Sequence, residues 1–185
     1  MFNIIIKRPK YKDVDELKKF FELIIVDTFI KEGVGHLKDD IRDEINSKIK
    51  YLNEDLESNG KKRYFLVAFL NDKIVGTIEY GKASELINKC TLGKLKAVVE
   101  IGTVFVHPNY QRKNIGNILL NSMFITLLSK GIEDFCLDSG YKIAQKIWIK
   151  KFGEPNYLLK DYWGKGYDHM IWYKNLNEIE IKFNL

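Results

Sequence analysis

Residues 104–120 read Val-Phe-Val-His-Pro-Asn-Tyr-Gln-Arg-Lys-Asn-Ile-Gly-Asn-Ile-Leu-Leu, and this segment constrains the fold more than any other. It begins as an apolar strand, continues through a proline-containing turn and a polar loop, and ends in a helix pattern. A loop that opens a helix presents backbone N–H groups and the positive end of the helix dipole, which together suit a pyrophosphate. The loop contains neither G-x-x-x-x-G-K-[ST] nor G-x-G-x-x-G. The segment therefore predicts a strand–loop–helix unit with an anion site of another kind.

The length of 185 residues favours one hydrophobic core, and no low-complexity stretch separates two halves. We therefore expect a single domain over residues 1–185. The longest apolar runs are far too short to span a membrane, and the N-terminus has no signal-peptide pattern. These features predict a cytoplasmic protein with no membrane partner. The two cysteines, Cys90 and Cys136, lack the spacing of a zinc or redox motif, so we expect no metal site and simply packed thiols.

The formal net charge of +5 is unevenly distributed along the chain. Residues 1–60 hold 11 Lys and Arg against 13 Asp and Glu, a net charge of −2, which leaves 19 against 12, or +7, for residues 61–185. Such polarity can steer a polyanionic cofactor to the basic part and a cationic amine to the acidic part. The lysines are scattered and no nucleic-acid motif is present, so we expect no nucleic-acid partner.

Hydrophobic periodicity predicts strands and helices in alternation, the pattern of an α/β or α+β layer fold. Gly or Asn-Gly marks the expected ends of several helices. The form of residues 82–95 is not predicted by any periodicity. In chain order, we expect a strand at 4–6, helices at 14–24 and 41–56, a hairpin of strands at 64–69 and 73–80, a strand at 97–106, a helix at 115–128, a strand at 135–137, a helix at 143–152 and a strand at 169–173.

The loop resembles the Gln/Arg-x-x-Gly-x-Gly/Ala loop of the GNAT acyltransferase superfamily, which is also preceded by Val-x-Pro. The matching residues are Val106-His107-Pro108 and then Gln111 through Gly116. The expected order of elements is similar to the GNAT topology from end to end, and residues 144–153 resemble its fourth helix. The resemblance implies a mixed, mostly antiparallel central sheet of six to seven strands flanked by about four helices.

The resemblance also implies a site for acetyl-CoA. In this family the backbone at the end of the fourth strand bonds the pantetheine arm, and the loop wraps the pyrophosphate. A polar residue after the fifth strand often contacts pantetheine, although Asp138 and Ser139 suit a helix cap equally well. Asn114 replaces the first loop glycine of the family, and Asn adopts special backbone geometry more readily than most residues. The implied cofactor residues are Phe105, Val106, Gln111, Arg112, Lys113, Asn114, Ile115, Gly116, Asn117 and Ser139.

Two catalytic residues follow from the same resemblance. The family's catalytic glutamate lies eleven positions before the loop Gln, which is Glu100 here, and strand alternation places it on the face opposite Val99 and Ile101. A charge that faces water is the alternative reading of Glu100, and Glu79 is the alternative base. The family's general-acid tyrosine falls on Ile149. Tyr141, or a tyrosine from the group Tyr157, Tyr162 and Tyr167, would have to substitute for it.

These observations predict an N-acetyltransferase that passes the acetyl group of acetyl-CoA directly to an amine of a small-molecule or peptide acceptor, within a ternary complex. Neither cysteine lies in the motif, which argues against a covalent acyl-enzyme. We expect residues 20–60 and the C-terminal strands to build the acceptor region. The alternative is a GNAT-fold module that binds acyl-CoA and has lost catalysis. The sequence does not identify the acceptor, and a monomer and a homodimer both remain open.

Overall fold

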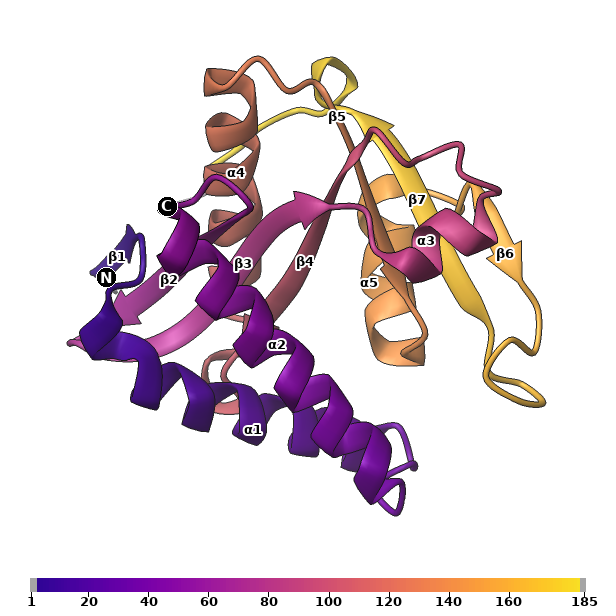
Figure 1. Ribbon diagram of the computed structural model, residues 1–185, viewed down its shortest axis with the longest axis horizontal. Coiled ribbons are helices and arrows are strands. Elements are labelled where there is room, and N and C mark those ends of the chain that lie inside the picture. Colours follow the sequence, from indigo (N-terminus) through magenta and orange to yellow (C-terminus); the bar gives the residue numbers. More distant parts are fainter. Residues whose placement is uncertain (1–2, 184–185) are drawn as a thin grey trace. The chain divides into compact units, whose positions relative to one another are not determined.

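The computed structural model describes residues 3–183 and contains seven strands and five α-helices (Figure 1). Short 3-10 turns precede α1, follow β4 and follow β7. The elements are β1 (Ile4–Lys7), α1 (Val14–Lys31), α2 (Lys38–Ser58), β2 (Arg63–Leu70), β3 (Lys73–Lys82), α3 (Glu85–Cys90), β4 (Val99–Val106), α4 (Ile115–Ser129), β5 (Asp134–Ser139), α5 (Lys142–Phe152), β6 (Tyr157–Leu159) and β7 (His169–Asn175).

The seven strands follow the order β1-β2-β3-β4-β5-β7-β6. β4 and β5 run parallel, whereas β1 with β2, β5 with β7 and β6 with β7 run antiparallel. This arrangement confirms the predicted mixed, mostly antiparallel sheet of six to seven strands. The structure has one helix more than the four expected. This helix is α3, which lies in the segment 82–95, where the sequence predicts no secondary structure. Its six residues are too few to show a clear helical period.

The chain divides into two compact units. The first unit consists of the residues up to Tyr80, Thr103–Thr126 and the residues from Ile181 onward. The second unit consists of Gly81–Gly102 and Leu127–Glu180. β3, β4 and α4 each have residues in both units, so the division cuts through these elements.

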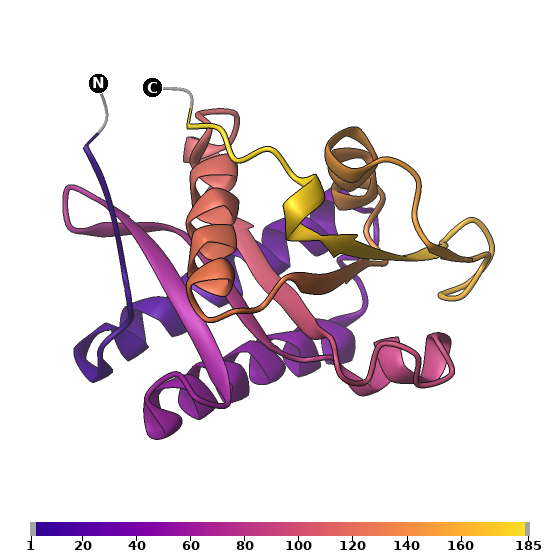
Figure 2. The same cartoon turned by 90° about the horizontal axis from the view of Figure 1, so that it is seen from above.

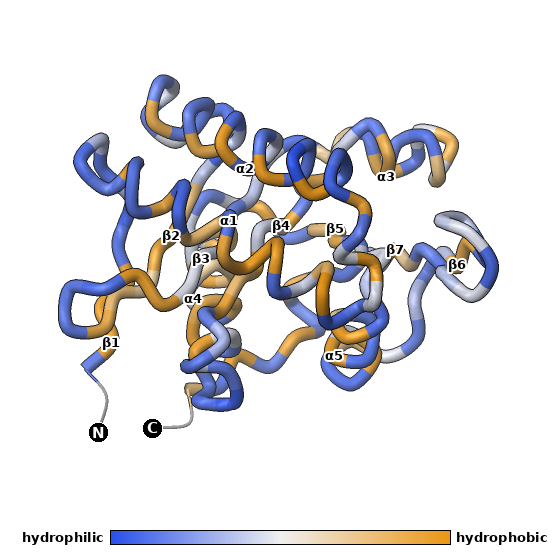
Figure 3. Tube along the Cα trace, turned by 90° about the horizontal axis from the view of Figure 1, so that it is seen from below, coloured by the Kyte–Doolittle hydropathy of each residue, from blue (hydrophilic) through white to orange (hydrophobic). Residues whose placement is uncertain are grey.

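In the first unit, β2 and β3 are buried along almost their whole length. They join through a tight turn in which Asn71 and Asp72 have left-handed φ values of 50° and 60°, the geometry of a hairpin turn. Helices cover both faces, with α1 and α2 on one side and α4 on the other (Figure 2). α1 and α2 alternate between hydrophilic and hydrophobic residues (Figure 3), which is the pattern of helices buried on one face, whereas α4 is predominantly apolar. Phe21 of α1 packs against Phe65 of β2, with ring centroids 6.2 Å apart.

In the second unit, the first residues of β4 pair with β5, and β7 lies between β5 and β6. Figures 2 and 3 place α3 and α5 on opposite sides of these strands. Ile87 of α3 packs with Cys136 and Ile171 in one apolar cluster. On the α5 side, the rings of Phe152 and Phe135 lie 5.8 Å apart. Each face of the strands therefore has its own apolar packing layer.

Within residues 3–183, no helix combines the length and the apolar character needed to cross a bilayer. The same residues contain no group of three or more His, Cys, Asp and Glu side chains that could hold a metal ion. Both cysteines are free thiols, with Cys136 buried and Cys90 half-buried. Burial, followed by the nearby carboxylates of Glu100 and Asp138, raises the pKa of the Cys136 thiol, which keeps this sulfur protonated and unreactive.

Candidate functional site

The chain leaves β4 through a short, hydrogen-bonded turn. The backbone N–H of His107 donates to the carbonyl of Val75 at 3.0 Å, so the register with β3 continues one residue beyond β4. The next turn, Pro108–Tyr110, is a 3-10 turn in which Nδ1 of His107 accepts the backbone N–H of Asn109 at 3.2 Å. These bonds fix the direction in which the chain enters residues 111–116, the candidate phosphate loop.

Two residues of this loop have left-handed backbones, Arg112 with φ 59° and Asn114 with φ 64°. Asn114 is followed by the helical Ile115, and a left-handed residue beside a right-handed one turns successive N–H groups toward a shared concavity that suits an anion. α4 begins directly after Asn114, since the N–H of Ile118 donates to the Asn114 carbonyl at 3.1 Å. The side-chain oxygen of Asn114 accepts a hydrogen bond from Nδ2 of Asn117 at 2.7 Å. The loop therefore ends at a helix N-terminus, as the sequence predicts.

The side chains of the loop add positive charge beside this helix end. Gln111, Arg112 and Lys113 are all exposed. Gln111 donates a hydrogen bond from Nε2 to the carbonyl of Val106 at 3.3 Å, which ties the loop to the end of β4. Lys113 extends its Nζ to 5.0 Å from the ring centroid of Tyr110. The arrangement can bind an anion through backbone dipoles together with one or two cations.

Gly116 lies in the first turn of α4. A Cβ at this position would contact only Cγ2 of Val106, at an ordinary distance of 3.7 Å. The Gly116 backbone is not left-handed either. The fold itself therefore does not require glycine here, and the missing side chain leaves the helix backbone open to the close approach of a ligand.

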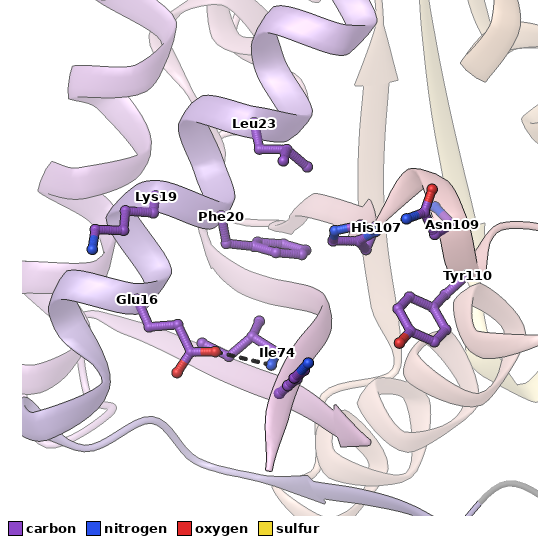
Figure 4. Close-up of a pocket in the computed structure, with 9 residues that line it drawn as sticks. Glu16, Lys19, Phe20, Leu23, Ile74, His107, Asn109 and Tyr110 are labelled. Atoms are coloured by element: carbon purple, nitrogen blue, oxygen red, sulfur yellow. Dashed lines mark hydrogen bonds between the residues drawn. The ribbon is translucent and has the colours of Figure 1, made fainter. Parts of the chain in front are cut away.

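A groove with a volume of about 460 Å³ lies beside the turn after β4 (Figure 4). Phe20 and His107 stand next to each other in it, with ring centroids 6.5 Å apart. Glu16 closes one side, where its carboxylate accepts the N–H of Ile74 at 3.2 Å. Its lining ends at Tyr110 and includes none of residues 111–116. The groove therefore borders the loop but is not formed by it.

Glu100 lies on β4 within the second unit and is 9% exposed. The register pairs it with Cys136 of β5, whose side chain belongs to the apolar cluster under α3. The backbone N–H of Ser84, which caps α3, donates to Oε2 of Glu100 at 2.6 Å. The carboxylate is therefore nearly buried on the α3 face and anchored by the start of that helix, rather than pointing freely into water.

Glu79 lies on β3 in the first unit and is 1% exposed. Its two oxygens accept hydrogen bonds from Nη1 of Arg63 at 2.9 Å and from Oγ1 of Thr103 at 3.2 Å. Both oxygens of this alternative base are thus already used inside the protein.

Ser139 and Tyr141 lie at the start of α5 in the second unit. Oγ of Ser139, which is buried, accepts the backbone N–H of Tyr141 at 3.0 Å, and Tyr141 is the N-cap residue of α5. This bond holds the turn that enters α5, although Ser139 is not the N-cap residue that the sequence offers as the alternative to pantetheine contact. Gln145 strengthens the same corner by donating from Nε2 to the carbonyls of Ser139 and Asp168, at 3.0 Å and 2.9 Å.

Sequence reasoning misses a chain of three side chains on the α3 face of the second unit. The indole N–H of Trp163 donates to Nδ1 of His169 at 3.1 Å, and Nε2 of His169 lies 3.0 Å from Oδ2 of Asp138. Because an indole can only donate, Nδ1 must be the acceptor and the proton of the neutral imidazole sits on Nε2. His169, which is 2% exposed, thereby orients the Asp138 carboxylate. No local sequence motif indicates this hydrogen-bonded series, since its bonded residues lie 6 and 31 positions apart.

Comparison with known proteins identifies the class that this fold and loop define. The model of the acetyltransferase (GNAT) family matches residues 27–153. The chain therefore belongs to the GNAT acetyltransferase family. No curated protein sequence matches the chain.

Solved structures share the fold along nearly the whole chain. A GNAT-family protein from Desulfovibrio desulfuricans has a TM-score of 0.70 at 14% identity, and the match covers 94% of this chain and 99% of that one. The PaiA N-acetyltransferase from Thermoplasma acidophilum, solved with coenzyme A, has a TM-score of 0.66 at 19% identity, over 94% and 99% of the two chains. The microcin C7 self-immunity acetyltransferase MccE, solved with acetyl-CoA and AMP, has a TM-score of 0.61 at 19% identity, over 93% and 92%. At these identities the similarity establishes a shared fold.

Proposed function

We propose that this protein is an N-acetyltransferase that transfers the acetyl group of acetyl-CoA directly to an amine of a small-molecule or peptide acceptor. Membership of the GNAT acetyltransferase family supports acetyl transfer in general. PaiA and MccE, which share the fold, were solved with coenzyme A and acetyl-CoA respectively. The observation that carries the proposal is the loop geometry, with left-handed Arg112 and Asn114 directly before α4.

The residues of the loop fit the pyrophosphate of this cofactor. The first turn of α4 supplies backbone donors and the positive end of its dipole. Arg112 and Lys113 add charge, and the bare backbone at Gly116 permits close approach. We assign Phe105 and Val106, at the end of β4, to the pantetheine arm and Gln111 through Asn117 to the phosphates, with Ser139 as a further contact. Bound acetyl-CoA supplies an acetyl group activated as a thioester.

Glu100 is our candidate for the general base. A lysine-like amine with a pKa of about 10.4 must lose its proton before it can attack, at a cost of about 4.6 kcal/mol at pH 7. A carboxylate held within hydrogen-bond reach of the amine can accept that proton. The bond from Ser84 restricts the Glu100 side chain to one position, which suits a group that has to meet its substrate in a fixed geometry. We propose Tyr141, at the start of α5, as the residue that returns a proton to the leaving thiolate.

One observation favours a second function, an acyl-CoA-binding module without catalysis. The half-buried Ile149 of α5 stands where the family has its general-acid tyrosine, and a hydrocarbon side chain cannot donate a proton. The two functions share the cofactor loop and differ only in turnover. For either function, we propose one domain over residues 1–185, a cytoplasmic location, a monomeric or homodimeric state and no nucleic-acid or membrane partner.

Calorimetry with coenzyme A tests the shared part of the proposal. We expect saturable binding by the wild-type protein. Gly116→Glu should weaken binding at least ten-fold, or about 1.4 kcal/mol, because it adds bulk and like charge beside the phosphates. Gly116→Ala is the matched control, since its Cβ meets only Val106 at 3.7 Å. Unchanged affinity of Gly116→Glu would place the pyrophosphate elsewhere, and no binding by the wild type would refute both functions.

Release of free thiol from acetyl-CoA across a panel of primary amines then separates the enzyme from the module.

A further inference from the structure

Thr103 has an unusual backbone for its place in the fold. It lies inside β4, yet its φ is 50°, in the left-handed region, and it is 4% exposed. A β-branched residue in this region is a genuine outlier, and its backbone is strained. Surrounding contacts must therefore hold Thr103 in place.

Two residues of β3 supply these contacts. The hydroxyl of Thr103 donates to Oε1 of Glu79 at 3.2 Å, and its carbonyl accepts the hydroxyl of Thr77 at 3.0 Å. Thr77, like Thr103 itself, is buried. The hydroxyl and the carbonyl of Thr103 are thus both held by β3, and the surrounding residues exclude water.

Glu79 is itself held by a wider network. Its second oxygen accepts a hydrogen bond from Arg63 at 2.9 Å. The Arg63 guanidinium lies 3.5 Å from the ring centroid of Tyr51 and 3.5 Å from the carboxylate of Glu54, both on α2. Burial raises the pKa of Glu79, while the charges of Arg63 and Lys48 oppose that rise. A polar path therefore runs from α2 through Arg63 and Glu79 to the backbone of β4.

The position of Thr103 gives this path a consequence for the site. Thr103 comes three residues after Glu100 and two before Phe105, and a left-handed residue redirects the peptide groups that follow it. We propose that Glu79 is a positioning residue that holds the left-handed turn at Thr103 and so sets the direction of the Phe105 and Val106 backbone toward the cofactor. This inference rests on the proposed function, which assigns these two residues to the pantetheine arm. It also assigns Glu79 a role other than that of the general base.

Removing the hydroxyl of Thr103 tests the contact. Thr103→Val keeps the branched shape but removes the hydroxyl that donates to Oε1 of Glu79. Thr103→Ser keeps this hydroxyl. We expect Thr103→Val to weaken coenzyme A binding about ten-fold, or about 1.4 kcal/mol of binding free energy, because the turn before Phe105 and Val106 is then no longer held. Thr103→Ser should stay within about three-fold. Without ligand, amide hydrogen exchange at Phe105 and Val106 should accelerate only in Thr103→Val. Wild-type affinity and exchange in Thr103→Val would overturn the inference, while failure of the wild type to bind coenzyme A would refute the proposed function itself.

Glu79→Gln separates a positioning residue from a base. A positioning role predicts a raised KM for acetyl-CoA and a pH–rate profile with an unchanged midpoint. Glu100→Gln is the contrasting variant, because loss of the base should be partly restored at high pH as the amine deprotonates itself. Recovery of Glu79→Gln at high pH would make Glu79 the base and overturn the inference. The double variant Thr103→Val/Glu79→Gln should bind no more weakly than the worse single variant, because both substitutions alter the same contact between residues 103 and 79. Additive losses would contradict the shared contact, and Thr103→Val alone decides the matter if Glu79→Gln does not fold.

Discussion

Asn114 shows how one residue meets two demands at the entrance to α4. Its backbone is left-handed, with φ 64°, and its side-chain oxygen accepts a bond from Asn117 at 2.7 Å. Asn is the non-glycine residue that adopts this geometry most easily, because its short polar side chain can bond locally. A glycine at this position would accept the same left-handed backbone without steric cost.

Substitution of Asn114 measures this demand directly. Asn114→Gly should keep the free energy of unfolding within about 1 kcal/mol of the wild type, since glycine adopts the required φ without steric cost. Asn114→Ala should lose about 1–2 kcal/mol, because Cβ now opposes the left-handed backbone and no local bond compensates. Chemical denaturation monitored by circular dichroism checks both values. Asn109→Ala, at an exposed position of the 3-10 turn and without a left-handed backbone, is the control. Equal losses in the Gly and Ala variants would show that the side-chain bond, and not φ, holds the loop.

At the scale of elements, the contact between β3 and α4 sets how closely the first turns of α4 pack on the sheet. Gly76 makes this contact possible. A Cβ at Gly76 would lie 2.8 Å from Cδ1 of Leu119, 3.0 Å from the carbonyl oxygen of Phe105 and 3.3 Å from Cγ2 of Ile115. A glycine inside a strand often marks a bulge or a close approach of another backbone, and at Gly76 the structure shows a close approach. The helix that opens with the candidate phosphate loop is therefore packed directly on β3.

Gly76→Ala should consequently act on both stability and cofactor binding. The added methyl group has to displace α4 or the backbone of β4, so we expect a loss of about 1–3 kcal/mol in the free energy of unfolding. Coenzyme A affinity should fall as well, because the displaced residues include the first turn of α4. Gly116→Ala adds the same methyl group to α4 itself, where it fits, and should be at least as stable as the wild type through better helix propensity. Denaturant titration of the two variants gives the comparison, and a Gly76→Ala protein as stable as the wild type would contradict this account of the packing.

The elements differ in how far the sequence alone could predict them. Long amphipathic helices such as α1 and α2, and the hairpin at Asn71, follow from local periodicity and turn chemistry. The short α3 does not, and its cap residue Ser84 is what anchors Glu100. The side-chain bonds of the loop are local, whereas those that hold the two candidate bases join distant residues, such as Ser84 to Glu100 and Thr103 to Glu79, 16 and 24 positions apart. A left-handed Thr inside a strand also has no signal in a single sequence. Motif spacing could therefore predict the loop before α4 and indicate Glu100 as a candidate base, but not the contacts that hold them.

At the scale of the whole molecule, the two compact units share three elements. β4 contributes Val99–Gly102 to the second unit and Thr103–Val106 to the first, and β3 and α4 also pass from one unit to the other. Unfolding of either unit removes residues from strands that the other unit needs for its own packing. We therefore predict that the units unfold together, as one cooperative domain over residues 1–185.

The distribution of chromophores makes this prediction measurable without labels. All three tryptophans, Trp148, Trp163 and Trp172, lie in the second unit, whereas the two longest helices, α1 and α2, lie in the first. Tryptophan fluorescence therefore reports unfolding of the second unit, and circular dichroism at 222 nm is dominated by the first. We expect the two urea transitions to coincide. Both should move to higher urea when coenzyme A is added, because a bound ligand stabilises every part of the protein that unfolds together with its site. Separate midpoints, or a shift of only the dichroism transition with ligand, would show two independently unfolding units instead.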